Sequence, residues 1–188
     1  MRQLRAPYQE QACQWALERL KFIDESGVNL ALTRSHGRAA PGERVVEAVP
    51  QNYGSNVTLL AALSLNGVSA PWILEGSVDT EAFRLYLDQV LGPALQPGDI
   101  VVMDNLSVHK VAGLTELLSS RGARLEYLPP YSPDLNPIEK CWSKIKTALR
   151  KAKARTLEAL EEALKKAFAS IAESEARAWF NHCGYAVH

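Results

Sequence analysis

Two stretches decide the fold of this chain: Ile100-Val101-Val102-Met103-Asp104-Asn105 and Leu128-Pro129-Pro130-Tyr131-Ser132-Pro133-Asp134-Leu135-Asn136-Pro137-Ile138-Glu139. The first is apolar at four successive positions, which is typical of a central strand covered on both faces, and it runs directly into a carboxylate. The second is rich in proline and predicts a loop followed by a helix from Pro137 to about Lys151. Asp104 is therefore expected at a strand end and Glu139 in the first turn of a helix, with 34 residues between them.

The sequence on either side alternates between strand and helix patterns. Residues 19–24 and 28–34 are expected to be strands joined by a hairpin turn at Glu25-Ser26-Gly27, and residues 57–65 and 68–74 a second pair around Asn66-Gly67. Apolar residues at helical spacing, together with one further strand-like run, predict the following elements: helices at 8–20, 80–91, 110–120, 156–171 and 173–182, and a strand at 125–128. An antiparallel meander followed by strand–helix–strand–helix predicts one mixed α/β domain over residues 1–188, with helices on both faces of the sheet. That is the layout of the ribonuclease-H-like fold, although composition alone does not single it out.

The composition fits an ordinary globular protein. The 188 residues are 47% hydrophobic and 22% charged, and no apolar run reaches the roughly 20 residues needed to span a membrane. The N-terminal residues lack the apolar core of a secretory signal. The cysteines are odd in number and widely spaced (Cys13, Cys141 and Cys183), which argues against a disulfide framework or a cysteine zinc site. The chain is therefore expected in the reducing cytoplasm, with no membrane partner.

Three carboxylates are candidates for a metal site: Asp24, Asp104 and Glu139. Cutting a phosphodiester bond needs an activated water and a stabilised leaving oxygen, and two Mg²⁺ or Mn²⁺ ions held by carboxylates can supply both. Asp24 ends a predicted strand and shares the parity of Leu20 and Phe22, whereas Glu25, the second choice, has the opposite parity.

Each carboxylate also has a structural interpretation. Asp24 also suits the opening of a turn, and Asp104 also suits the loop after its strand. Glu139 lies three residues after Asn136, which is a capping-box arrangement. Asp134 could be a third or substitute ligand, but it lies in a turn where Asp is common. The spacing of His36, His182 and His188 is not that of metal ligands.

Positive charge is unevenly distributed, although 21 basic residues balance 21 acidic ones. Residues 140–155 contain seven basic residues and no acidic one. Such a run is more often a solvated helix face, but it also suits DNA phosphates beside an acidic site. Residues 35–44 are rich in glycine and basic residues and predict either a surface loop or an extended arm. Candidate DNA contacts are Arg38, Arg44, His109, Lys110, Lys140, Lys144, Lys146 and Arg150.

The residues assembled so far resemble a known family, the catalytic (DDE superfamily endonuclease) domain of mariner-superfamily insertion-sequence transposases. The resemblance runs from about Arg19 to Tyr185. The segments that carry it are Phe22-Ile23-Asp24-Glu25-Ser26-Gly27, Met103-Asp104-Asn105, His109-Lys110, the block from Tyr127 to Glu139, and Trp142.

The resemblance implies a catalytic triad of Asp24, Asp104 and Glu139, because the family has 34 residues between its last two catalytic carboxylates. It also implies a ribonuclease-H-like fold and Mg²⁺-dependent cleavage of double-stranded DNA at element ends. The freed 3′-hydroxyl would then attack target DNA at a TA dinucleotide, and the protein would act as a homodimer. Because only about 20 residues precede the first predicted strand, we expect the family's helix-turn-helix region to be absent here. A separately encoded N-terminal half is one way to supply it.

Three other functions compete with this interpretation. The chain could be a catalytically idle truncated transposase that dimerises with an intact one and regulates it. It could be another nuclease of the same fold, such as a ribonuclease H or a junction resolvase, but these lack the proline-rich block. A phosphoacceptor receiver domain also uses a strand-end aspartate, but it expects parallel strands from the start.

Overall fold

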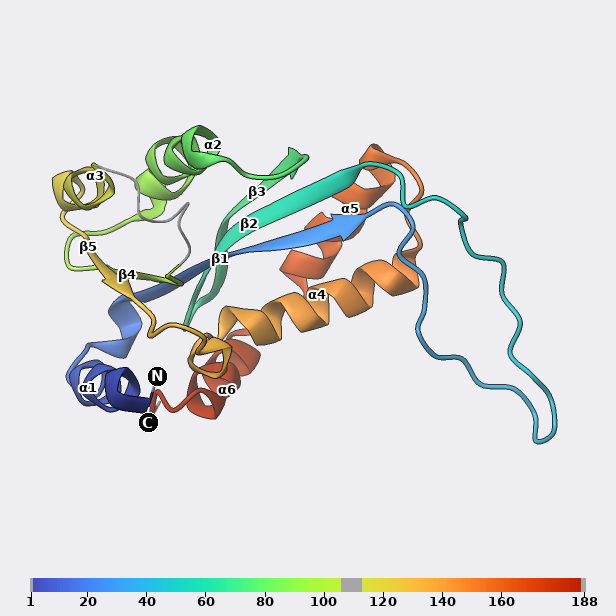
Figure 1. Cartoon of the computed structure of the whole chain (residues 1–188), viewed down its shortest axis with the longest axis horizontal. Coiled ribbons are helices and arrows are strands. Elements are labelled where there is room, and N and C mark those ends of the chain that lie inside the picture. Colours follow the sequence, from blue (N-terminus) through green and yellow to red (C-terminus); the bar gives the residue numbers. More distant parts are fainter. Residues whose placement is uncertain (1, 106–112, 187–188) are drawn as a thin grey trace.

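The protein is built on one five-stranded sheet. A computed structural model describes residues 2–105 and 113–186 (Figure 1). The strand order across the sheet is β3-β2-β1-β4-β5. The strands are β1 (Leu20–Asn29), β2 (Asn56–Ser64), β3 (Gly67–Glu75), β4 (Ile100–Met103) and β5 (Arg124–Tyr127).

Within this sheet, β2 runs opposite to the other four strands. The pairs β1–β2 and β2–β3 are antiparallel, whereas β4 runs parallel to both β1 and β5. This mixed arrangement confirms the predicted meander followed by parallel strands. It also excludes the receiver-domain alternative, which requires parallel pairing from the first strands.

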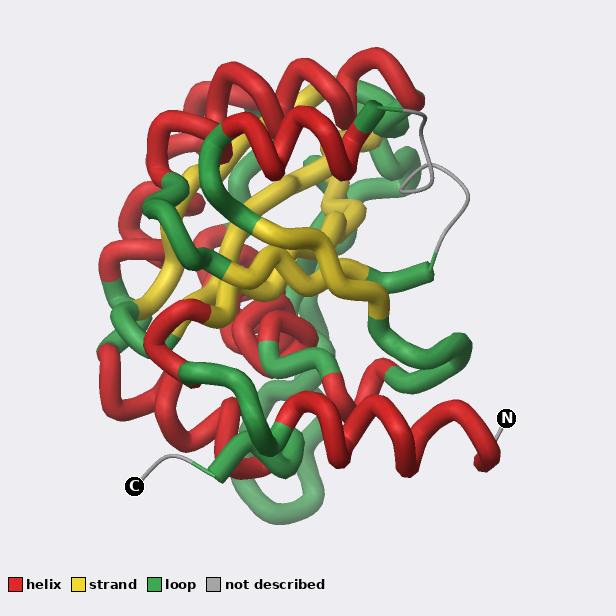
Figure 2. Tube along the Cα trace, turned by 90° about the vertical axis from the view of Figure 1, so that its left-hand side faces the viewer, coloured by secondary structure: helices red, strands yellow, loops and turns green. Residues whose placement is uncertain are grey.

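Helices cover both faces of the sheet, as predicted (Figure 2). One face carries α1, α4, α5 and α6, and the other carries α2, the π-helical segment that continues it, and α3. The helical elements are α1 (Arg2–Ala12), α2 (Thr80–Leu85), the π-helical segment (Tyr86–Leu91), α3 (Leu114–Ser120), α4 (Ile138–Ala152), α5 (Leu157–Ala169) and α6 (Glu173–His182).

Alternation along the strands builds a separate core on each face. In β4, Ile100 and Val102 pack on the α4 side, whereas Val101 and Met103 pack against α2 and α3. All four are buried, which confirms that this apolar run is a central strand. The same parity places Leu20 and Phe22 of β1 on the α4 side.

Several predicted boundaries are wrong, two of them at the N-terminal helix and in β1. Residues 25–27 form no hairpin turn, because Glu25, Ser26 and Gly27 stay in register with Leu60, Leu59 and Thr58 of β2. The long partner strand satisfies their backbone groups, so β1 continues to Asn29. The N-terminal helix begins earlier than predicted and ends at Ala12, and Trp15 then packs edge-on against Tyr8.

Residues 30–55 leave the sheet as a long irregular loop, hereafter the arm, which projects beyond the rest of the molecule (Figure 1). Its base is attached to the end of α4. Arg155 donates hydrogen bonds to the carbonyl oxygens of Leu30 (2.8 Å) and Leu32 (3.0 Å). Glu47, on the returning leg, forms an ion pair with Lys153. The predicted strand at 28–34 is therefore wrong beyond Asn29, whereas the alternative of an extended arm for residues 35–44 is confirmed.

Among the described residues, no helix is both long enough and apolar enough to cross a lipid bilayer.

Candidate active site

Two of the predicted carboxylates lie on adjacent parallel strands: Asp24 lies inside β1, not at its end as predicted from the sequence, and Asp104 directly follows β4. Ile23 of β1 pairs with Met103 of β4, so Asp24 and Asp104 are the next residues along the two strands. Neighbouring strands lie about 4.8 Å apart, so these two positions lie side by side where β4 ends next to β1. The strand pairing thus turns residues that are 80 positions apart in the sequence into neighbours.

The third carboxylate, Glu139, comes to the same place from α4. After β5, the backbone N–H of Leu128 donates to the carbonyl oxygen of Met103 (2.9 Å), and the proline-rich loop then crosses the strand ends. The helix begins at Ile138, so Glu139 lies in its first turn. Ile138 is fully buried, whereas Glu139 is exposed to solvent. The side chain of Glu139 is therefore exposed to solvent beside Asp24 and Asp104.

All three carboxylates line one pocket of about 450 Å³. Its remaining lining residues are Asn105, Leu128, Pro129, Pro130, Tyr131, Ser132, Pro133 and Asn136. Within residues 2–105 and 113–186, no three His, Cys, Asp or Glu side chains lie close enough together to hold a single metal ion. The site is therefore an open group of carboxylates rather than a closed cage.

Asp24 is buried and oriented by hydrogen bonds to both of its carboxylate oxygens. It is 7% exposed, and its Oδ1 accepts a hydrogen bond from the backbone N–H of Glu25 (2.8 Å). Its Oδ2 accepts a hydrogen bond from Nδ2 of Asn136 (3.4 Å). A buried carboxylate with donors to both oxygens is held in one orientation.

Asn136 is a site residue that the sequence interpretation missed, since the sequence favoured it as a helix cap. It is 3% exposed, and its Oδ1 has no hydrogen-bond partner in the described part of the chain. A buried amide oxygen without a partner is costly, so an unsatisfied acceptor that lines this pocket points to a ligand. The clue in the sequence was its position three residues before Glu139.

Two alternatives for the carboxylates are not found. No side chain caps α4, so the capping-box interpretation of Glu139 is wrong. Glu25 does not line the pocket, in keeping with its opposite strand parity.

Asp134 also lies outside the lining residues. It bonds with Arg5 of α1 instead, and that contact holds the pKa of the Asp134 carboxyl below its usual value.

The donor set suits a hard divalent cation. Every candidate ligand offers oxygen, from the carboxylates of Asp24, Asp104 and Glu139 and from the amide of Asn136. Mg²⁺ usually binds one or two carboxylates and completes its shell with water and substrate phosphates. An open group of oxygens therefore fits Mg²⁺ or Mn²⁺ bound together with a phosphate. It does not fit an ion whose ligands all come from the protein.

Tyr131 stands at the mouth of the pocket. Its side chain is 86% exposed, and its backbone has φ of 54°, in the left-handed region that bulky residues rarely adopt. Backbone strain of this kind is often found at functional sites. The loop geometry thus presents an aromatic ring to solvent beside the carboxylates.

The predicted DNA contacts fall into separate groups. Lys144 forms an ion pair with Glu175 of α6 and donates to the carbonyl oxygen of Ser170, so it faces the helices that pack on α4. Lys146 and Arg150 line a hollow on another side of α4. Lys140 is exposed near the pocket end of the helix.

Two other predicted contacts lie on the arm rather than on α4. Arg38 and Arg44 are exposed on the arm. His109 and Lys110 lie outside the described residues.

Comparisons with known proteins agree with this geometry. Residues 19–161 match the profile of a protein family described as DDE superfamily endonuclease. No curated protein sequence matches the chain significantly. Among solved structures, the chain is similar to the catalytic domain of the Mos1 mariner transposase, with a TM-score of 0.70 and 15% identity over 97% of this chain and 90% of that chain.

The chain is also similar to a larger protein in the Mos1 mariner paired end complex with Mn. There the TM-score is 0.75 and the identity 18%, over 97% of this chain and 56% of that chain. At identities this low, the structural similarity establishes the fold alone. It confirms the predicted ribonuclease-H-like fold. The chain thus spans about 56% of the length of the transposase in that complex.

Proposed function

Because the chain belongs to the DDE superfamily endonuclease family, we propose that it is the catalytic domain of a metal-dependent DNA transposase. In the proposed reaction, water cleaves a phosphodiester bond at an element end, and the freed 3′-hydroxyl then attacks a phosphodiester bond of target DNA at a TA dinucleotide. The observation that carries the proposal is that Asp24, Asp104 and Glu139 line one pocket. The proposed domain spans residues 1–188.

Asp24, Asp104 and Glu139 are the proposed ligands of Mg²⁺ or Mn²⁺. Two such ions, when bound, would activate the attacking oxygen and stabilise the leaving oxygen. Asp24 and Asp104 follow paired residues of β1 and β4, so they suit one ion, and Glu139 adds a carboxylate for a second. Relatives have been solved as Mos1 mariner paired end complexes with Mg and with Mn, which supports divalent metal use.

The protein contributes orientation and charge. Asn136 and the backbone of Glu25 hold the Asp24 carboxylate before substrate arrives, so less reorganisation is needed during the reaction. Glu139 is exposed at the start of α4, and its side chain can adjust when a phosphate enters. The pocket is open to solvent, as a site for a long polymer must be.

The proposed partners are double-stranded DNA and a second copy of the chain. Mos1 transposase has been solved in a paired end complex with the left transposon end, and that relative supports transposon-end DNA as the substrate here. A separately encoded N-terminal half remains part of the proposal as the source of end-specific DNA recognition. The three cysteines are free thiols, which suits the proposed cytoplasmic location.

The test is cleavage or strand transfer on a supplied DNA duplex with Mn²⁺, comparing the wild type with Asp104→Asn. Asp88→Asn is the matched control, because it makes the same chemical change at a partly exposed carboxylate on the other face of the sheet. We expect products from the wild type and the control but not from Asp104→Asn. Equal activity in all three proteins would refute the assignment of Asp104. If even the wild type is silent when a separate DNA-binding half is supplied, the chain is the idle regulator instead.

A further inference from the structure

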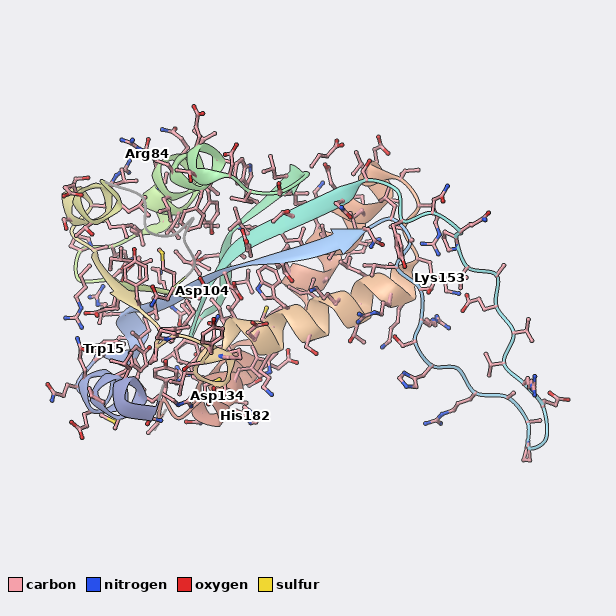
Figure 3. The ribbon with its side chains drawn as sticks, viewed as in Figure 1. Trp15, Arg84, Asp104, Asp134, Lys153 and His182 are labelled. Atoms are coloured by element: carbon pink, nitrogen blue, oxygen red, sulfur yellow. The ribbon has the colours of Figure 1, made fainter. Side chains whose placement is uncertain are left out.

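Helix α4 carries a line of hollows that begins at the catalytic pocket. Glu139 lines that pocket, Lys146 and Arg150 line a second hollow of about 610 Å³, and Arg150 also lines a third of about 500 Å³. With 3.6 residues per turn, Glu139, Lys146 and Arg150 lie within about 40° of one another around the helix. Figure 3 shows Asp104 near the beginning of α4 and Lys153 at its far end, where the base of the arm lies.

The third hollow has an unusual lining. Its described residues are Arg34, Ser35, His36, Thr147, Arg150 and Lys151, with four basic side chains, two hydroxyls and no carboxylate. None of these four basic side chains has an ion-pair partner among the described residues. Like charges that converge without a counter-ion repel one another, so the arrangement favours binding of an anion.

The arm is fixed where it enters this hollow. Arg155 bonds to the carbonyl oxygens of Leu30 and Leu32, and the ion pair of Lys153 with Glu47 attaches the returning leg. Arg34 and His36 follow Leu30 and Leu32 within a few residues and precede Glu47. The hollow is therefore a preformed meeting of two segments more than 100 residues apart, rather than a chance approach of surface lysines.

The way from the catalytic pocket to this hollow is open. Strand β4 pairs only with Leu20–Ile23 of β1, so in the described part of the chain β1 has no strand beside it on that edge beyond Asp24. The second hollow lies along this part of β1, since Gly27, Val28 and Asn29 line it. A long polymer lying over Asp24 would reach the third hollow without a strand in its way.

From this arrangement we propose that Arg34, His36, Arg150 and Lys151 form a phosphate-binding site for the backbone of duplex DNA whose scissile phosphate occupies the catalytic pocket. The proposal rests on the proposed function for its substrate. Arg150 lies eleven positions after Glu139 on α4, which is about 16 Å along the helix axis. At 3.4 Å per base pair, the site holds a phosphate roughly five base pairs from the cleaved bond. Arginine pairs well with phosphate oxygens because its planar donors match their geometry.

The experiment measures salt-dependent binding of the full chain to a duplex of about 30 base pairs without divalent metal, so that no cleavage occurs. Each phosphate contact contributes a slope of about −0.9 in log K against log salt. We expect Arg34→Gln/Arg150→Gln to reduce the slope by about 2, as the loss of two contacts requires. Arg34→Lys/Arg150→Lys keeps the charges and should keep most of the slope.

The matched control is Arg84→Gln/Lys166→Gln, which removes the same charge from two exposed positions on α2 and α5. Figure 3 shows Arg84 away from α4, on the helix layer across the sheet. The control should keep the wild-type slope, and thermal melting should show all variants folded. An unchanged slope in Arg34→Gln/Arg150→Gln, or an equal loss in the control, would overturn the proposal.

Binding and cleavage report on different claims. A reduced slope together with a wild type that never cleaves DNA supports the phosphate site and contradicts the catalytic proposal. Cleavage that depends on Asp104, together with an unchanged slope, contradicts the phosphate site alone.

Discussion

Arg5 in α1 holds Asp134 in the proline-rich loop across 129 positions of sequence. Its guanidinium donates to both carboxylate oxygens of Asp134, one of them at 2.9 Å, and to Oγ of Ser132 at 3.0 Å. Ser132 lines the same pocket as Asp24, Asp104 and Glu139, whereas Asp134 does not. The N-terminal helix, which precedes the residues matched by the family profile, thus supports the loop that leads to Glu139.

This contact predicts a pH-dependent contribution to stability. Arg5 holds the pKa of Asp134 below its ordinary value of 3.8, so the contact stabilises the folded state when the carboxylate is ionised. The contribution is present above pH 3.8 and is lost as the pH falls through the lower folded-state pKa. Arg5→Gln should therefore lower the free energy of unfolding at neutral pH, and the difference from the wild type should vanish in strong acid.

Urea unfolding of the wild type and Arg5→Gln at pH values from neutral to acid measures this difference. In an Asp134→Asn background, Arg5→Gln should have little further effect. A difference that stays constant down to the lowest pH would show that Arg5 acts through packing rather than through the carboxylate.

Asn136 predicts a coupled loss of stability and metal affinity. Asn136→Ala removes the donor to Oδ2 of the buried Asp24 carboxylate, so we expect the free energy of unfolding to fall by about 1–3 kcal/mol. Weaker Mn²⁺ binding should accompany it, because the Asp24 carboxylate is then less firmly oriented. Chemical unfolding and calorimetric titration with Mn²⁺ measure the two effects. Unchanged Mn²⁺ affinity would limit Asn136 to a structural role.

Metal binding should stabilise the fold. A divalent ion that binds only the folded state at ten times its dissociation constant adds about 1.4 kcal/mol, or roughly 3–5 °C in melting temperature. Glu139→Gln removes a proposed ligand and should reduce this shift, whereas Glu161→Gln, an exposed carboxylate on α5, should leave it intact. Thermal melting with and without Mg²⁺ is the measurement. The same shift in both variants would remove Glu139 from the metal site.

Lys144 and Lys146 should behave differently although they are two residues apart. Lys144 bonds to Glu175 and to the carbonyl oxygen at the end of α5, so Lys144→Met should cost about 0.2–1 kcal/mol of stability and leave DNA binding unchanged. Lys146→Met should leave stability unchanged and reduce the salt dependence of duplex binding by about one phosphate contact. A melting curve and a salt titration for each variant decide this. Equal effects on DNA binding would mean that the whole basic run faces DNA.

The sequence by itself determined the parts that depend on local pattern. The uninterrupted apolar run of β4 required a strand buried on both faces, and the period of the apolar residues in α4, α5 and α6 placed those helices within one or two residues. The proline-rich block and the spacing of Asp104 and Glu139 identified the family resemblance and the candidate carboxylates. Strand parity indicated Asp24 rather than Glu25 for the pocket.

Only the tertiary structure decided what depends on distant partners. Pairing with β2 carried β1 through the predicted turn at residues 25–27, because a neighbouring strand satisfies backbone groups that local sequence would place in a turn. Asp134 bonds to Arg5 and lies outside the pocket. Asn136 donates a hydrogen bond to Asp24 and does not cap its own helix. The basic residues of positions 140–155 also have different partners. Lys144 pairs with Glu175 of α6, whereas Arg150 lines a hollow with the base of the arm. In each case the contact joins residues far apart in sequence, and the free energy of such contacts is set by the packing of the whole fold rather than by the neighbouring residues.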